Sequence, residues 1–213
     1  MFDFINSLHW HISKAHEFPG IQQKLHELRV EGQLSHQGWS ELQNQRLRKL
    51  FIFAKEHVSY YKKFFSQISF NPESADLPSD INKIPILTKD LIRENFKELI
   101  AETAKRSHMF ENATGGSTGV PLKFYQDQQY QTIAAAIDTY VKEWWGIHPY
   151  DRTASVWGAD REFQDLSFKE RLYSWRYRSR SINAFRMSDE NLLNFLKMLE
   201  SWRPPYLTGY SSA

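Results

Sequence analysis

The chain has 213 residues, of which 41% are hydrophobic and 24% are charged, and its formal net charge is +2. This is the composition of a globular protein, and the charge is too small to indicate a polyanion partner by itself. There are no cysteines, which excludes disulfides, thiolate zinc sites and a cysteine nucleophile. No run approaches the ~18 apolar residues of a membrane span, and the N-terminus lacks a secretory signal pattern, so a soluble cytoplasmic protein is expected.

Helices are predicted for most of the first hundred residues. From residue 47 onward, apolar side chains recur at the helical spacings of three and four, as in Leu50, Phe51, Ala54 and Val58. Residues 4–16 and 21–31 have a weaker pattern of the same kind. After a predicted loop at 71–80, which is rich in Pro, Ser and Asp, Thr88 is a favoured N-cap residue. A helix is therefore expected from Lys89 to about Ile100.

After residue 105 the pattern changes to strands that alternate with helices. Strands are predicted at 108–113, 121–125, 153–157, 181–185 and 206–210, with helices at 128–145 and from 189 to the prolines at 204–205. Ser188 is the predicted cap of the last helix, and its buried stripe is predicted to be Leu192, Leu193, Leu196 and Leu199. The predicted fold class is α/β, with a helical N-terminal region at 1–105 and, at 106–213, a mixed sheet with flanking helices.

A turn at residues 114–121 carries the strongest functional signal, with the sequence T-G-G-S-T-G-V-P. Glycine permits positive φ and close approach of backbone amides, and Thr114, Ser117 and Thr118 add hydroxyl donors. Such a turn can wrap phosphate oxygens. It has neither the Walker spacing nor the dinucleotide pattern G-x-G-x-x-G. On local composition alone, a plain turn between two strands is an equally good interpretation.

The run T-G-G-S-T-G-V-P-L-K resembles the Ser/Thr- and Gly-rich phosphate loop of the adenylate-forming superfamily. Four further blocks are similar to segments of the phenylacetate–coenzyme A ligase family, the last two to its branch associated with capsular polysaccharide biosynthesis. The blocks are Ala54–Phe65, Ile84–Ile92, Asn183–Leu192 and Arg203–Ser212. With the loop, they follow the family's order and cover most residues from about 50 onward.

This resemblance implies an AMP-forming ligase. A carboxylate attacks the α-phosphate of ATP to give an acyl-adenylate and pyrophosphate, and a thiol, often that of CoA, then displaces AMP. Mg²⁺ accompanies the ATP. Charge grows on the phosphates in the first step, so preorganised donors matter most there. The implied ligands of the β- and γ-phosphates are the loop residues Thr114, Gly115, Gly116, Ser117, Thr118 and Gly119.

The chain departs from the family pattern in two respects. In many superfamily members a lysine directly follows the proline, whereas here Leu122 intervenes and the lysine is Lys123. Along a strand this shift turns Lys123 to the other face, so a solvated strand lysine is an alternative to a phosphate contact. The family's downstream adenine-binding strand, ribose-binding Asp and catalytic Lys cannot be matched before Ala213. The chain is therefore expected to be truncated at its C-terminus and inactive in isolation, with its catalytic residues unknown.

A second hypothesis is a catalytically silent binding or scaffold module of the same fold. Under either hypothesis the acid and the acceptor are not determined, and an exposed strand edge at Tyr206–Tyr210 would favour self-association, including a homodimer. The eight histidines show no metal-ligand spacing, so no metal site is predicted. Trp157–Asp160 follows a strand end, where it either lines the acyl pocket or forms a plain turn.

Arginines interleave with aromatic residues late in the chain, at Arg171, Arg176, Arg178 and Arg180. Such a pattern can bind nucleic acid through charge and stacking. The cluster is short and the net charge is small, so a solvated helix end or loop is the better interpretation. Contact with an anionic substrate or with the phosphates of CoA is a third interpretation of these arginines.

Overall fold

The computed structural model describes residues 2–77, 79–114, 121–157, 172, 174–184 and 187–209. The chain divides into two compact units, one of Met1–Leu25 with Ala134–Ala213 and the other of His26–Ile133. The boundary predicted near residue 105 marks a change of pattern along the sequence and stays a prediction. No helix in the described part of the chain has the length and apolar character needed to cross a membrane.

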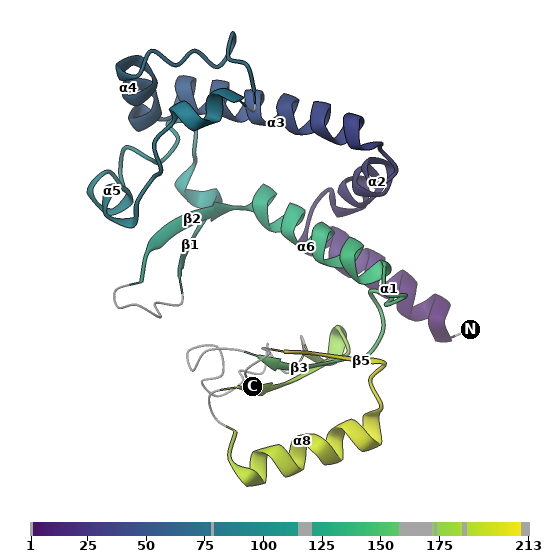
Figure 1. Ribbon diagram of the computed structural model, residues 1–213. Coiled ribbons are helices and arrows are strands. Elements are labelled where there is room, and N and C mark those ends of the chain that lie inside the picture. Colours follow the sequence, from purple (N-terminus) through teal and green to yellow (C-terminus); the bar gives the residue numbers. More distant parts are fainter. Residues whose placement is uncertain are drawn as a thin grey trace. The chain divides into compact units, whose positions relative to one another are not determined.

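Helices make up most of the chain before β1 (Met109–Ala113), as predicted. These elements are α1 (Phe2–Glu17), α2 (Ile21–Glu31), α3 (His36–His57), α4 (Ser59–Gln67), η1 (Ser79–Lys83), α5 (Lys89–Glu94) and η2 (Arg106–His108). Helix α3 begins earlier than the periodicity at residue 47 indicated, because the Ser35 side chain accepts a hydrogen bond from the Gly38 amide and caps it. Figure 1 shows α3 as the long helix beside α4.

The core of the unit His26–Ile133 lies between α3, α4 and the loop that follows. Its buried members are Ala54, Phe65, Phe70, Ala75 and Leu77. The rings of Phe51 and Phe70 meet edge to face at 5.5 Å, a favourable aromatic geometry. Arg48 holds the predicted loop in place, since its guanidinium donates to the carbonyls of Pro72, Glu73 and Ala75 at 2.7–2.9 Å. The loop thereby packs without regular secondary structure.

Helix α5 is shorter than predicted. Thr88 caps it as expected, accepting from the Leu91 amide at 3.3 Å. The helix was expected to reach Ile100 but ends at Glu94, with Asn95 as its C-cap. The Asn95 amide and its side-chain Nδ2 both donate to the Leu91 carbonyl. This side-chain bond competes with helix propagation, and the chain turns instead.

The strands occur in two sheets. Strands β1 (Met109–Ala113) and β2 (Lys123–Asp127) form an antiparallel pair, while β4 (Ser179–Asn183), β3 (Thr153–Trp157) and β5 (Tyr206–Gly209) form a parallel sheet in that order. The α/β class is confirmed. Both strand directions of a mixed sheet are present, but each has a sheet of its own among the described residues.

Helix α6 (Gln128–Glu143) follows β2 directly. Asp127 caps its start, where Oδ1 accepts from the Tyr130 amide at 2.7 Å. Its predicted end at Trp145 is two residues too late. Gly146 has φ +69°, and the bonds from its amide to Glu143 and from Ile147 to Lys142 form a Schellman-type end.

The second core lies between the parallel sheet and α8 (Asp189–Trp202), which runs along the sheet in Figure 1. Ala154, Ile182 and Phe195 are its buried members, with Met198 and Leu199 packed against them. Ser188 caps α8 as predicted. The predicted buried stripe is wrong at three positions, because Leu192, Leu193 and Leu196 are exposed. Phe195 instead points to the sheet, and only Leu199 of the predicted stripe packs there.

Candidate phosphate-binding hairpin

The Gly- and hydroxyl-rich run lies in the sequence between β1 and β2, and these two strands pair antiparallel. The register pairs Met109 with Asp127 at one end and Ala113 with Lys123 at the other. Residues 114–122 therefore leave and re-enter the hairpin at neighbouring positions. Five of the predicted phosphate ligands lie outside the described residues, and these are Gly115, Gly116, Ser117, Thr118 and Gly119.

Thr114, the first residue of the turn, is bonded to Leu122 across the neck of the hairpin. Its amide donates to the Leu122 carbonyl at 3.0 Å, and its side-chain Oγ1 accepts from the Leu122 amide at 3.0 Å. The backbone N–H of Thr114 is thus used within the hairpin. Only its hydroxyl hydrogen remains as a donor for a ligand.

Lys123 is the first residue of β2, and its ammonium points away from the turn. Nζ lies 2.8 Å from Glu111 Oε1, and Glu111 sits two residues farther from the turn than Ala113, the cross-strand partner of Lys123. Two strand residues span about 6.6 Å. The hydrogen bond that Lys123 donates to Glu111 raises the pKa of Lys123, so the lysine is a charged cation that is held by a carboxylate.

A pocket of about 460 Å³ lies beside the hairpin in the same unit. Apolar side chains from α5 and the segment after it line the pocket together with β2, among them Ile92, Phe96, Leu99, Ile100 and Tyr125. The rings of Phe96 and Tyr125 are 5.6 Å apart. Sequence reasoning did not identify this pocket, although most of these apolar residues lie in the segment that was predicted to be a helix from Lys89 to about Ile100.

The start of α6 also adjoins the hairpin, and it offers no open anion site. Helix N-termini attract anions through their free amides and dipole. Here the Asp127 carboxylate already accepts from the Tyr130 amide. An anion placed there would meet the negative charge of Asp127, so the start of α6 is not a candidate anion site.

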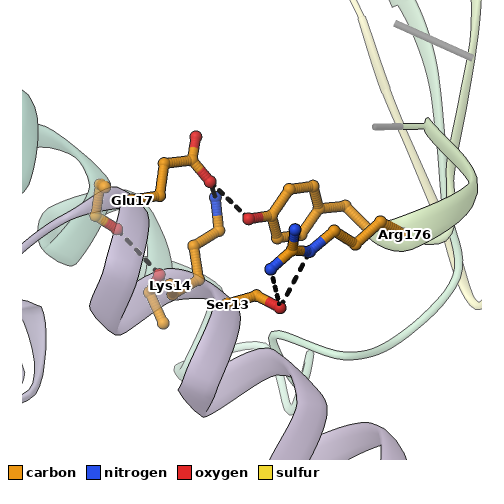
Figure 2. Close-up of polar contacts among 7 residues, drawn as sticks. Ser13, Lys14, Glu17 and Arg176 are labelled. Atoms are coloured by element: carbon orange, nitrogen blue, oxygen red, sulfur yellow. Dashed lines mark hydrogen bonds and ion pairs between the residues drawn. The ribbon is translucent and has the colours of Figure 1, made fainter. Parts of the chain in front are cut away.

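The late arginines have partners within the protein. Arg176 donates from Nε and Nη2 to Ser13 Oγ at 3.0 and 2.7 Å, and Figure 2 shows this contact beside Lys14 and Glu17. Arg178 donates to the Tyr150 carbonyl at 3.1 Å. The Arg180 guanidinium lies 4.8 Å from the Trp202 ring centre. Arg171 lies outside the described residues.

Arg176, Arg178 and Arg180 therefore make structural contacts within the protein. This differs from the predicted solvated helix end or loop. Arg176 and Tyr177 tie α1 to the segment before β4, since the Tyr177 hydroxyl also donates to Glu17. Lys14 lies 4.2 Å from the Tyr177 ring centre. Burial lowers the pKa of Lys14, and the neighbouring Glu17 opposes that shift.

Metal-binding side chains do not gather in the part of the chain that the structure describes. Those residues contain no group of three or more His, Asp or Glu side chains that could hold one. Trp157 is the last residue of β3 and is exposed, whereas Gly158, Ala159 and Asp160 lie outside the described residues. A role for this strand end in an acyl pocket stays a prediction.

Comparison with known proteins identifies relatives in sequence and in fold. No protein-family model matches the chain. Over 176 residues the chain is 30% identical to Protein CapK of Staphylococcus aureus, a match that covers 81% of this chain and 38% of CapK. Two crystal structures of 2-hydroxyisobutyryl-CoA ligase in complex with 2-HIB-AMP and CoA have a similar fold, each at 17% identity.

The ligase in its thioesterification state gives a TM-score of 0.62 and matches 82% of this chain and 37% of the ligase. The open conformation of the ligase gives a TM-score of 0.59, and that match covers 82% of this chain and 41% of the ligase. The chain thus spans about two fifths of the length of these proteins. The resemblance is confirmed: the chain is similar to the capsule-biosynthesis branch of the phenylacetate–coenzyme A ligase family, and its fold is that of the N-terminal domain of an adenylate-forming ligase.

Proposed function

We propose that this chain is the phosphate-binding part of an AMP-forming ligase that activates a carboxylic acid with ATP. The observation that supports the proposal is the run at 114–121, which carries three glycines and three hydroxyl residues and joins two strands that pair antiparallel. Such a turn aims several N–H and O–H donors at one point, which suits the oxygens of a polyphosphate.

In the proposed reaction a carboxylate oxygen of the substrate bonds to the α-phosphorus of ATP, and pyrophosphate leaves with the electron pair of the broken P–O bond. The acyl group then passes from the acyl-adenylate to CoA or another acceptor, and AMP leaves.

Loop residues are proposed to hold the β- and γ-phosphates as charge accumulates on them. These residues are Gly115, Gly116, Ser117, Thr118 and Gly119. Lys123 contributes a positive charge near the turn once Glu111 releases it.

ATP, Mg²⁺ and CoA are the small molecules that the proposal requires. The solved ligases contain 2-HIB-AMP and CoA, which supports an adenylate and a thioester step for a protein of this fold. The described residues supply no cluster for a metal, so no step is assigned to Mg²⁺, which would arrive bound to ATP. Capsular polysaccharide biosynthesis is the proposed setting, because the chain is similar in sequence to CapK, and the cytoplasm is the proposed location.

The test is the exchange of labelled pyrophosphate into ATP, measured in a protein that joins this chain to the further length its relatives have. Exchange should require the right carboxylic acid. Thr118→Val and Gly119→Val should each lower the rate by more than about tenfold, because they misplace phosphate donors. Thr103→Val is the matched control, since Thr103 is exposed and lies outside the turn. Unchanged exchange in a folded Gly119→Val protein would refute the assignment.

A catalytically silent module of the same fold is the second candidate. It is favoured by the share of CapK that the chain spans, which is 38%, and by the absence of an adenosine pocket among the motifs that the sequence contains. Contacts to phosphate alone bind weakly in water, because water competes for the same donors. We therefore expect the chain by itself to bind ATP weakly and to form no adenylate. Calorimetry that gave tight ATP binding to this chain alone would contradict that expectation.

A further inference from the structure

We propose that the pocket between the hairpin and the segment after α5 binds a small monocarboxylic acid with an apolar body, and that Lys123 recognises its carboxylate. The pocket holds about 460 Å³, which is within the usual size range of small-molecule sites. The inference goes beyond the proposed function, because the residues that carry it lie outside the run at 114–121.

The floor of the pocket is one face of the hairpin. Side chains alternate between the two faces of a strand, and cross-strand partners share a face. Tyr125 faces the segment after α5, because its ring centre lies 5.6 Å from that of Phe96. Lys123 and Asp127 share this face, two residues to either side of Tyr125 along β2. Glu111 shares it as the cross-strand partner of Tyr125. The face therefore has an aromatic centre with charged groups toward its ends.

The opposite wall is held in place by the protein itself. Leu99, Ile100 and Ala101 line the pocket there, and the residues on both sides of them are bonded to the junction of α3 and α4. The Tyr60 amide donates to the Glu98 carbonyl at 3.1 Å, and the Glu102 amide donates to the His57 carbonyl at 2.7 Å. A wall that is already ordered lowers the conformational cost of binding a ligand.

The polar group that suits a ligand of this pocket is the Lys123 ammonium. Lys123 lines the pocket, and its Nζ lies 2.8 Å from Glu111 Oε1. An ammonium has three N–H donors, of which a single bond of this kind uses one. The two side chains are 66% and 52% exposed, and such ion pairs contribute little to stability. A ligand carboxylate can therefore join Glu111 on Lys123 or replace it at small cost.

Asp127 restricts the ligand to a single carboxylate. It also lines the pocket, four residues along β2 from Lys123, which is about 13 Å along an extended strand. A second carboxylate on the ligand would lie among apolar side chains or approach Asp127, and both positions are unfavourable for a negative charge. The ligand class that fits is an apolar acid with its charge at one end.

The test uses the 213-residue chain and three probes of equal length: hexanoate, its uncharged amide hexanamide, and the dicarboxylate adipate. NMR shifts of the Tyr125 and Ala101 amides report binding, and the dispersion of each spectrum shows that the variant is folded. Ala104→Phe fills the pocket, since Ala104 lines it and is exposed. Thr103→Phe is the matched control, because the side chain of Thr103 is also exposed but is not part of the lining.

Hexanoate should bind about tenfold or more tightly than adipate, because the second charge of adipate has no partner in an apolar interior. Lys123→Gln should weaken hexanoate binding by about two- to fivefold, the size of an exposed ion pair, and should leave hexanamide binding unchanged. Glu111→Gln should strengthen hexanoate binding by a similar factor, because it removes the competing carboxylate. Ala104→Phe should abolish binding of hexanoate and hexanamide, whereas Thr103→Phe should bind both normally.

Three results would overturn the proposal. If hexanoate shifts neither amide, the pocket does not take such acids. If Ala104→Phe binds hexanoate as the parent chain does, the acid binds elsewhere. If Lys123→Gln weakens hexanoate and hexanamide binding equally, Lys123 shapes the hairpin and does not recognise the carboxylate. Failure of the proposed function is distinguishable, because it would appear in the exchange of pyrophosphate into ATP, and these titrations contain no ATP.

Discussion

Replacing Phe65 by alanine should remove most of the stability of the unit that carries the hairpin. Phe65 lies on α4 and is 1% exposed. Its ring centre lies 5.0 Å from that of Phe70, 5.4 Å from that of Tyr61 and 5.9 Å from that of Phe51. The side chain therefore joins α3, α4 and the loop after α4, and its loss leaves a cavity bounded by all three.

The size of the effect follows from burial and ring contacts. Phe→Ala in a core costs about 3–5 kcal/mol, and the cost rises when the site cannot collapse. Rings on several sides resist collapse, and each aromatic pair adds about 0.5–1.5 kcal/mol beyond its buried area. We therefore expect Phe65→Ala to lower the free energy of unfolding of this unit by about 4 kcal/mol. Phe65→Leu, which keeps most of the apolar atoms, should cost about 1–2 kcal/mol.

Hydrogen exchange followed by mass spectrometry can assign the loss to one unit. Peptides from α3 and α4 should exchange about a thousandfold faster in Phe65→Ala, the factor that corresponds to ~4 kcal/mol. Peptides from β3 and β4 belong to the other unit and should change less. Phe53→Ala is the matched control, because Phe53 lies on α3 but is 44% exposed, and it should cost less than about 1 kcal/mol.

Equal losses in Phe65→Ala and Phe53→Ala would refute this reasoning, since the argument depends on burial. The reasoning would also be refuted if Phe65→Ala lowered the free energy of unfolding by less than about 2 kcal/mol. Such a small loss would mean that the neighbouring rings close the cavity.

Three further changes test other parts of the structure. A methyl group on Gly209 would lie 3.0 Å from the Val156 carbonyl oxygen. Gly209→Ala should therefore lower the free energy of unfolding by about 1–3 kcal/mol, and with it the melting temperature. An unchanged melting temperature would show that β5 can shift to accommodate the methyl group. Burial, with two nearby carboxylates, raises the pKa of Tyr206 to about 12 from 10.0. The folded chain keeps this proton where the unfolded chain loses it, so its stabilising effect is present below pH 10 and is lost as pH rises towards 12; urea titrations of Tyr206→Phe should lack this loss. Ser13→Ala removes the acceptor of two hydrogen bonds from Arg176. It should lower the free energy of unfolding by only about 1 kcal/mol, because Arg176 is exposed and water can replace the serine hydroxyl. A double-mutant cycle with Arg176→Ala that showed no coupling energy would contradict this prediction.

Local chemistry allowed much of this structure to be predicted from sequence. The caps Thr88 and Ser188 were correct, because a cap needs only its own side chain and an amide three residues on. Strand β3 was predicted at 153–157 and lies at Thr153–Trp157, since a short apolar run between polar segments identifies a buried strand. The hairpin around the turn was also predicted, and only its register came from the structure.

Other errors came from local bonds that a periodic pattern does not reveal. Asn95 ended α5 through its own side chain, although the helix was predicted to reach Ile100. Apolar residues of the segment after Asn95 line the pocket beside the hairpin. Residue spacing predicts which positions share a face, but it does not predict whether a backbone carbonyl is taken by a side chain.

The candidate site shows the same division. The sequence by itself determined which residues are the candidates for phosphate binding, because three glycines and three hydroxyls within six positions form a chemical property of the chain. Only the tertiary structure decided that the Lys123 ammonium pairs with Glu111 and that the Thr114 hydroxyl accepts from Leu122. It also decided that α8 buries Phe195 and leaves Leu192, Leu193 and Leu196 exposed. These outcomes depend on partners brought together by strand pairing and helix packing, and pairing energies between distant residues are not encoded in the pattern of any one segment.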